Sequence, residues 1–321
     1  MISTLKTYGQ ILVKSAHDFI ADDALKFSAS LSYYTVFSIA PVLIIIIGIS
    51  GLFFGREAVT GEVFSQFSGL MGERSAALLE EAISNVQLNG QSGIATIFGV
   101  VMLIIGSTGV FSELQDSLNK IWSLKAQPNR GWIHYLTNRL ISFSMILTLG
   151  FLLIVSLLIN AVINLISENL FAQYNSWAWM AQTINIIMIV GIITVLFAFI
   201  FRFLPDVRLA WRDVWAGALF TTVLFLGGKF AIGFYLSKSA IATTFGAAGS
   251  LALMLAWVYY SSAILFFGAE FTKNYALHYS KHIVPDDYAS FVVTSEKELS
   301  ANCDAKKMTQ EKEKSALKGG H

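Results

Sequence analysis

The sequence predicts an all-α, polytopic membrane protein with six transmembrane helices. Of its 321 residues, 55% are hydrophobic and only 13% are charged, and this charged share is about half that of an average soluble domain. The apolar residues gather in runs of roughly 20, the length at which a helix crosses the hydrocarbon core of a bilayer. The run 245–271 shows this most clearly, because it contains no charged residue before Glu270.

Six such runs alternate with polar or amphipathic segments. Residues 1–28 predict an amphipathic cytoplasmic helix, because apolar residues recur every three or four positions opposite Lys6 and Lys14. We expect short amphipathic helices in the outer loop 55–93 and a cytoplasmic tail over 272–321, disordered from about residue 296. The predicted spans are about 29–54, 94–111, 140–166, 183–203, 214–236 and 245–271.

The distribution of positive charge predicts the orientation. Of the 22 Lys and Arg residues, 18 fall on the N-terminal segment, on the second and fourth loops with Arg202, and on the tail. The opposite side carries Arg56, Arg74 and Lys238, and Lys229 lies within the fifth span. Because cytoplasmic loops are enriched in Lys and Arg, we predict that both termini are cytoplasmic.

Composition and motifs argue against several classes of function. The formal net charge of +1 gives no support for a nucleic-acid-binding surface. The patterns GxxxxGK[ST], GxSxG and HExxH are absent, so we predict no enzyme activity and no cofactor. His278, His282 and Asp286 follow one another at intervals of four, but two histidines without a third firm ligand are weak evidence for zinc, and we predict no metal site.

Polar residues at the predicted cytoplasmic ends of the spans form the candidate functional site. Charge inside a membrane is costly, so ionisable groups near the spans are functional candidates by default. Glu113, Asp116 and Asn119 are three apart, which places each neighbouring pair on one helix face. Two interpretations stay open, an ion-paired mouth to a cavity between the helices or a scatter of ordinary interfacial charges. The candidate residues are Asp22, Lys26, Glu113, Asp116, Asn119, Arg202 and Glu270.

Four residues inside the spans are notable. Pro41 cannot donate a backbone hydrogen bond to the carbonyl of Phe37, which predicts a kink. Gly106 and Gly109 allow either a helix break beside a binding cavity or the close approach of a neighbouring helix. Lys229 lies about 22 Å along its span, so it either snorkels to the outer headgroups or faces a cavity.

Four stretches, taken in order, indicate a family. They cover residues 22–41, 106–122, 202–218 and 245–270, and the last contains Trp257-Val258-Tyr259-Tyr260-Ser261 and Gly268-Ala269-Glu270. Together they resemble the YihY/BrkB family of bacterial inner-membrane proteins over roughly residues 15–280. The resemblance implies six helices, a bacterial inner-membrane location and a role in the cell envelope. Members have been labelled virulence factors and, in our view wrongly, ribonuclease BN.

The resemblance and the residues together suggest a function. We expect a multi-pass protein of the bacterial inner (plasma) membrane that transports a lipid or another amphiphilic envelope component, with membrane lipids as partners. The alternative is a non-transporting envelope scaffold or assembly factor. A ribonuclease is disfavoured, because a net charge of +1 and five unclustered histidines offer neither a phosphate-binding surface nor an acid–base pair. The sequence leaves open whether the protein forms a homo-oligomer.

Overall fold

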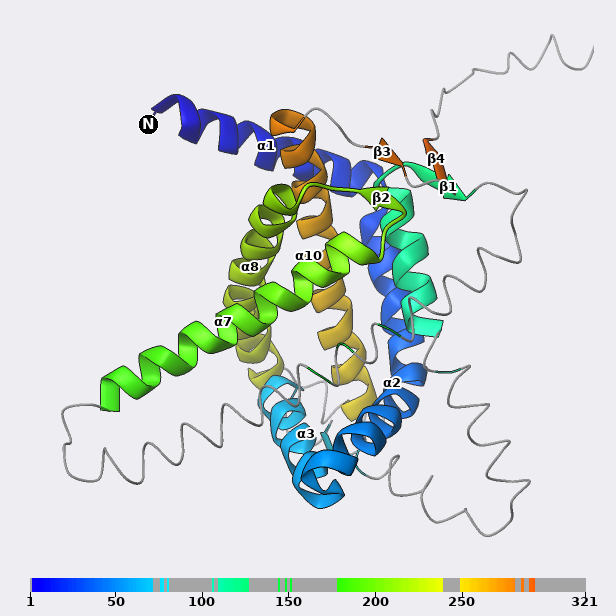
Figure 1. Ribbon diagram of the computed structural model, residues 1–321, viewed down its shortest axis with the longest axis vertical. Coiled ribbons are helices and arrows are strands. Elements are labelled where there is room, and N and C mark those ends of the chain that lie inside the picture. The colour runs from blue at the N-terminus through cyan, green and yellow to red at the C-terminus, as the bar shows by residue number, and fades with distance from the viewer. Residues whose placement is uncertain are drawn as a thin grey trace, which may run out of the picture. The chain divides into compact units, whose positions relative to one another are not determined.

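The computed structural model describes residues 2–71, 109–126, 178–238, 249–280, 284–285 and 289–291, together with the single positions 76, 77, 80, 106, 144, 148 and 151. This part of the chain is almost entirely helical (Figure 1). The labelled helices are α1 (Ile2–Ala21), α2 (Ala24–Phe54), α3 (Arg56–Met71), α7 (Ala178–Phe203), α8 (Trp211–Lys238) and α10 (Gly249–Tyr279). Residues 109–121 are also helical. The strands are short: β1 (Leu124–Ala126), β2 (Val207–Arg208), β3 (Val284–Pro285) and β4 (Ala289–Phe291), with β2 and β3 antiparallel.

Four described helices are long and apolar enough to cross a membrane. The candidate spans are Ala24–Leu52, Ile186–Phe203, Trp211–Ile232 and Leu251–Tyr279. They confirm the helices that the sequence predicts for the first, fourth, fifth and sixth spans. Most of the predicted second span, 94–111, and almost all of the third, 140–166, lie outside the described residues. Six spans and cytoplasmic termini therefore stay predictions.

The helix boundaries differ from the predicted segment boundaries at two places. The helix predicted over 1–28 ends at Ala21, and the spanning helix α2 already begins at Ala24. Asp23 separates them with a left-handed backbone (φ 56°), which no residue within an α-helix can adopt. At the other end of the chain, α10 continues beyond residue 271 to Tyr279, because Asn274, Tyr275 and Ala276 are buried and extend the packed face of the helix.

The main core joins α2, the helical segment 109–121, α7, α8 and α10. Its fully buried members include Leu118, Ile121, Phe201 and Phe266. A second cluster packs α3 against α2 and α10 through Val59, Val63 and their neighbours. Large apolar side chains also point outward, and a lipid environment favours them there.

Helices α8 and α10 approach each other through a reciprocal glycine–threonine contact. A Cβ on Gly217 of α8 would overlap Thr272 of α10, and a Cβ on Gly268 of α10 would overlap Thr221 of α8. Each threonine hydroxyl donates to the glycine carbonyl one turn earlier on its own helix, at 2.7 Å in both cases. Small residues of this kind let helix backbones come close in membranes. The contact fixes the position of Glu270, which lies between Gly268 and Thr272.

Candidate functional site

The site is centred on Glu270, which lies on the membrane-spanning helix α10. Its side chain is completely buried. Phe266 and Ala269 on the same helix are also fully buried, so the carboxylate stands in a packed apolar environment. A carboxylate in such a place is strongly destabilising unless a charge or hydrogen bonds compensate it.

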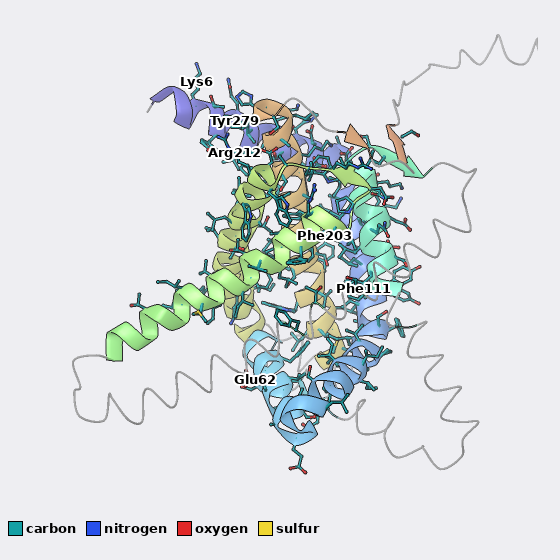
Figure 2. The ribbon with its side chains drawn as sticks, in the orientation of Figure 1. Lys6, Glu62, Phe111, Phe203, Arg212 and Tyr279 are labelled. Atoms are coloured by element: carbon teal, nitrogen blue, oxygen red, sulfur yellow. The ribbon has the colours of Figure 1, made fainter. Side chains whose placement is uncertain are left out.

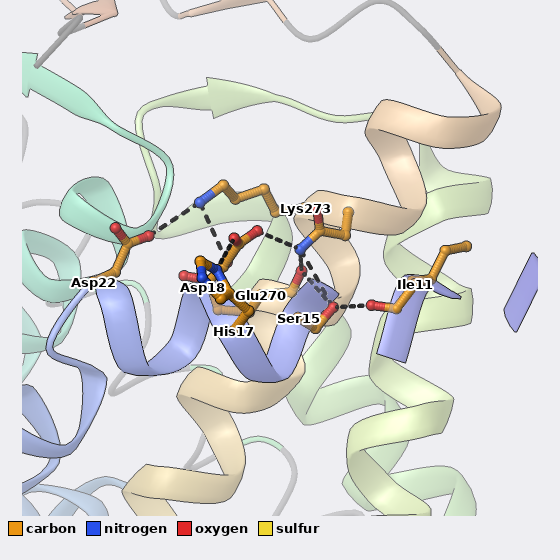
Figure 3. A network of polar contacts seen from close by, with 8 residues as sticks. Ile11, Ser15, His17, Asp18, Asp22, Glu270 and Lys273 are labelled. Carbon is orange, nitrogen blue, oxygen red and sulfur yellow. Dashed lines mark hydrogen bonds and ion pairs between the residues drawn. The ribbon is translucent and has the colours of Figure 1, made fainter. Parts of the chain in front are cut away.

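Lys273 supplies the compensating charge. Its Nζ lies 3.2 Å from Oε2 of Glu270, one turn away on the same helix. The same Nζ lies 3.1 Å from Oδ2 of Asp22, in the turn that joins α1 to α2. The side chains of Asp22, Lys273 and Glu270 are 33%, 15% and 0% exposed. The three charges therefore form a chain that leads from a partly solvated carboxylate to a buried one (Figure 3).

Asn274 links α1 to α10 through hydrogen bonds next to these charges. Its Nδ2 donates to Oδ2 of Asp18 at 2.9 Å and to Oγ of Ser15 at 3.3 Å, both on α1. It also lies 3.1 Å from the backbone carbonyl of Glu270. Ser15 is itself buried and donates to the carbonyl of Ile11 at 2.8 Å. We call Ser15, Asp18, Asp22, Glu270, Lys273 and Asn274 the α1–α10 network.

Three oxygen atoms of the network lack hydrogen bonds. Within the part of the chain that the structure describes, Oε1 and Oε2 of Glu270 and Oδ1 of Asn274 accept none. The Glu270 carboxylate is paired with the ammonium group of Lys273. Buried polar atoms are nearly always satisfied in folded proteins, and exceptions call for an explanation. Oε2 of Glu270 is compensated by the charge of Lys273, whereas Oε1 of Glu270 and Oδ1 of Asn274 are buried acceptors without a donor among the described residues.

A second polar group holds the connection between α7 and α8. Asn119 donates to Oδ2 of Asp206 and accepts from the Asp206 backbone N–H, both at 2.8 Å. Gln115 donates to the other carboxylate oxygen of Asp206 at 3.1 Å. Arg202 donates to the carbonyl of Leu209, and its guanidinium lies 5.6 Å from the centre of the Trp211 ring. These contacts shape residues 204–210.

Four of the seven predicted mouth residues belong to these two groups. Asp22 and Glu270 come together through Lys273, whereas Asn119 and Arg202 belong to the group around residues 204–210. Lys26 and Asp116 are exposed and Glu113 is half-buried. The hypothesis of a single ion-paired mouth stays a prediction. Of the predicted mouth residues, Glu270 in the α1–α10 network is the one with a fully buried charged group.

Sequence reasoning missed the partners of the predicted residues. Ser15 and Asp18 lie three apart on one face of α1, and Asp22 follows four residues later in the turn after the helix. Lys273 follows Glu270 by three. That spacing indicates a row of polar residues that could meet between two helices. The contact of Asp206 with Asn119 joins residues 87 positions apart, and no local pattern indicates it.

The other predicted positions have the following places. Gly106 and Gly109 face α2, since a Cβ on Gly106 would lie 3.1 Å from Cγ of Pro41 and one on Gly109 would lie 3.6 Å from Oγ of Ser38. This supports the close-packing interpretation. α2 continues through Pro41 as a helix, and Lys229 is half-buried on α8. His278 is exposed at the end of α10, and His282 and Asp286 lie outside the described residues. The described part holds no group of three or more His, Cys, Asp or Glu placed to bind a metal.

Comparison with known proteins identifies the family. A family model described as virulence factor BrkB matches residues 15–288, nearly the whole helical part. The chain belongs to the BrkB family.

Curated relatives agree with this assignment. The chain is 27% identical to a UPF0761 membrane protein of Pseudomonas paraeruginosa, over 81% of this chain and 61% of the relative. It is 25% identical to a UPF0761 membrane protein of Alkalilimnicola ehrlichii, over 81% and 57% of the two chains. This BrkB-family chain therefore spans about three fifths of the length of these curated relatives. No solved structure matches it.

Proposed function

We propose that this BrkB-family membrane protein transports a lipid or another amphiphilic component of the bacterial cell envelope across or within the inner membrane. The proposal describes a non-enzymatic, multi-pass protein whose partners are membrane lipids and not nucleic acids. Homo-oligomerisation stays open.

The buried charge network on a spanning helix is the observation that supports transport most strongly. Ionisable residues within membrane segments are rare, and they commonly mark the paths of substrates or ions. Glu270 is completely buried, its oxygens accept no hydrogen bond among the described residues, and Lys273 links it to the partly exposed Asp22. A static bundle has no need of such a costly group in its interior, whereas a transport cycle can use a charge whose pairing changes.

One observation favours the scaffold alternative. The close glycine–threonine contact between α8 and α10 leaves little room for these two helices to slide past each other. If they are rigid, any transport cycle must move other helices against this pair. A scaffold would need no such motion, and a direct measurement of transport separates the two functions.

The test is a lipid-translocation assay with the purified full chain in vesicles of bacterial lipid extract. A fluorescent phospholipid in the inner leaflet is protected from a membrane-impermeant quencher until it is translocated. We expect the protein to accelerate its loss of protection over protein-free vesicles. Glu270→Gln, which keeps the size of the side chain and removes its charge, is expected to slow this rate about tenfold. The matched control is Glu57→Gln, at an exposed position of α3. Wild-type rates equal to those of empty vesicles would favour the scaffold.

A further inference from the structure

A groove lies between α1 and the last turns of α10. Its volume is about 220 Å³. A water molecule occupies about 30 Å³ in the liquid, so the groove has room for a group of phosphate size and its substituents. Its walls combine polar and apolar side chains, and they are formed by Thr7, Gln10, Ile11, Lys14, Asn274, Leu277 and His278.

The groove has cationic and hydrogen-bonding walls. Lys14 comes from α1 and His278 from α10, and both side chains are exposed. No ion pair joins Lys14 to any acidic residue in the described ranges. Lys6 and Arg212 lie at the same end of the molecule (Figure 2). An ammonium group and an imidazole N–H in one groove favour an anion with several acceptor oxygens, and a phosphate is such an anion.

Asn274, which lines the same groove, carries a buried acceptor. It is only 3% exposed, and its Nδ2 is already engaged by Asp18 and Ser15. Its Oδ1 accepts no hydrogen bond from any described residue. An amide oxygen without a hydrogen-bond donor can accept a hydrogen bond from an ammonium or a hydroxyl group of a ligand. The groove therefore offers complementary chemistry to a molecule with both a phosphate and a donor.

The position of α1 narrows the choice of ligand. Helix α1 crosses the end of the spanning helix α10 (Figure 1), and the two are packed together through Ile11, Phe271 and Tyr275. On other faces of α1, Val13 and Ile20 are 73% and 72% exposed. A helix with polar and apolar faces at the end of membrane spans is suited to the interface, the level at which lipid headgroups lie.

We propose that the groove between α1 and α10 binds the headgroup of a phospholipid, with the phosphate at Lys14 and His278 and an ammonium or hydroxyl group of the headgroup at Oδ1 of Asn274. This proposal deepens the proposed transport function, on which it rests, by naming the headgroup chemistry that the protein recognises. The groove would hold the lipid beside the α1–α10 network, since Asn274 belongs to both.

The test measures binding of short-chain lipids to the purified full chain in detergent. The probes are a phosphatidylethanolamine, a diacylglycerol with the same acyl chains and no phosphate, and inorganic phosphate. We expect the phosphatidylethanolamine to bind about tenfold more tightly than the diacylglycerol and inorganic phosphate to compete only weakly. Equal binding of the two lipids would overturn the proposal, and so would inorganic phosphate that binds as tightly as the phospholipid, because the site would then serve a free anion.

Two variants assign the binding to the groove. Lys14→Gln is expected to weaken binding of the phosphatidylethanolamine about fivefold, as the loss of one charge-assisted contact predicts. Lys6→Gln removes the same charge from an exposed position of the same helix outside the groove wall, and it is expected to leave binding unchanged. Equal effects of the two substitutions would contradict a specific site. This assay measures binding and not transport, so the two proposals can fail separately. Headgroup binding without translocation would reject the transport function and support the binding site in the groove. Translocation without headgroup selectivity would support transport and reject the binding site.

Discussion

Helix α10 packs against two partners in opposite ways. At the interface with α8, each helix places one glycine against a threonine of the other, and each threonine hydroxyl bonds to its own helix. Against α1 it presents a glutamate, a lysine and an asparagine, and three of their oxygens accept no hydrogen bond among the described residues. The two interfaces share one helix and meet near Glu270.

The difference suggests that the α8 interface serves stability and that the α1 interface serves function. Close packing of small residues in a membrane gives dispersion contacts and a fixed register, and it leaves no unsatisfied polar atom. A buried charge network adds little net stability, because the cost of removing the ions from water offsets their attraction. We therefore expect substitutions at the α8 interface to change stability alone, and substitutions at the α1 interface to change transport as well.

The largest effect is expected from removing the bridging charge of the α1 interface. Lys273→Met leaves Glu270 and Asp22 without their partner, and breaking a buried ion pair on one side costs about 3 kcal/mol or more. Thermal unfolding in a fixed detergent measures this against Lys26→Met, at an exposed position of α2. The double variant Lys273→Met/Glu270→Met should recover much of the loss. A double variant less stable than Lys273→Met alone would show that the charges do not act as a pair.

A somewhat smaller effect is expected at the α8 interface. Gly217→Ala places a methyl group against Thr272, and overpacking of this kind costs about 2 kcal/mol. The matched control on the same helix is Gly227→Ala, because a Cβ there meets no atom within 4 Å. Unfolding temperatures of the two variants measure the difference, and equal values would mean that the helices are not in close contact. Transport per folded molecule is expected to be unchanged in both.

The group around residues 204–210 allows an intermediate test of a polar contact outside both interfaces. Asn119→Ala removes two hydrogen bonds to Asp206 and is expected to lower the free energy of unfolding by about 1.5 kcal/mol. Asn119→Asp keeps the acceptor for the Asp206 backbone N–H but sets two carboxylates against each other, so it should be the less stable of the two at neutral pH. The opposite order would argue against the contact.

The smallest effect is expected at a neutral pair between α7 and α8. The hydroxyls of Thr194 and Thr222 lie 3.0 Å apart, and hydrogen bonds between membrane helices contribute about 0.6 kcal/mol on average. Thr194→Val should therefore shift the unfolding temperature only slightly. A loss as large as that of Gly217→Ala would show that neutral polar contacts between spans matter as much as close packing.

Local patterns predicted much of the helical part of the protein. The apolar runs place four of the predicted spans, because a run of about 20 apolar residues has few alternatives to a spanning helix. Asp22 and Glu270 were found because ionisable residues next to apolar runs stand out. The end of α1 was predicted less well, since a left-handed Asp23 leaves no periodic signal.

The sequence by itself determined that this is a helical membrane protein, where its described spans lie and which charges border them. These properties follow from the cost of exposing polar groups to lipid, which acts along one continuous segment of the chain. Only the tertiary structure decided which charges meet. Lys273, which pairs with Glu270, meets Asp22 across 251 positions of sequence, and Asn274 meets α1 over a similar separation. Such contacts depend on how α1 crosses α10, and the reciprocal fit of Gly217, Thr221, Gly268 and Thr272 decides where α10 stands. That fit is a matter of shape between distant segments, which no periodicity within one segment contains.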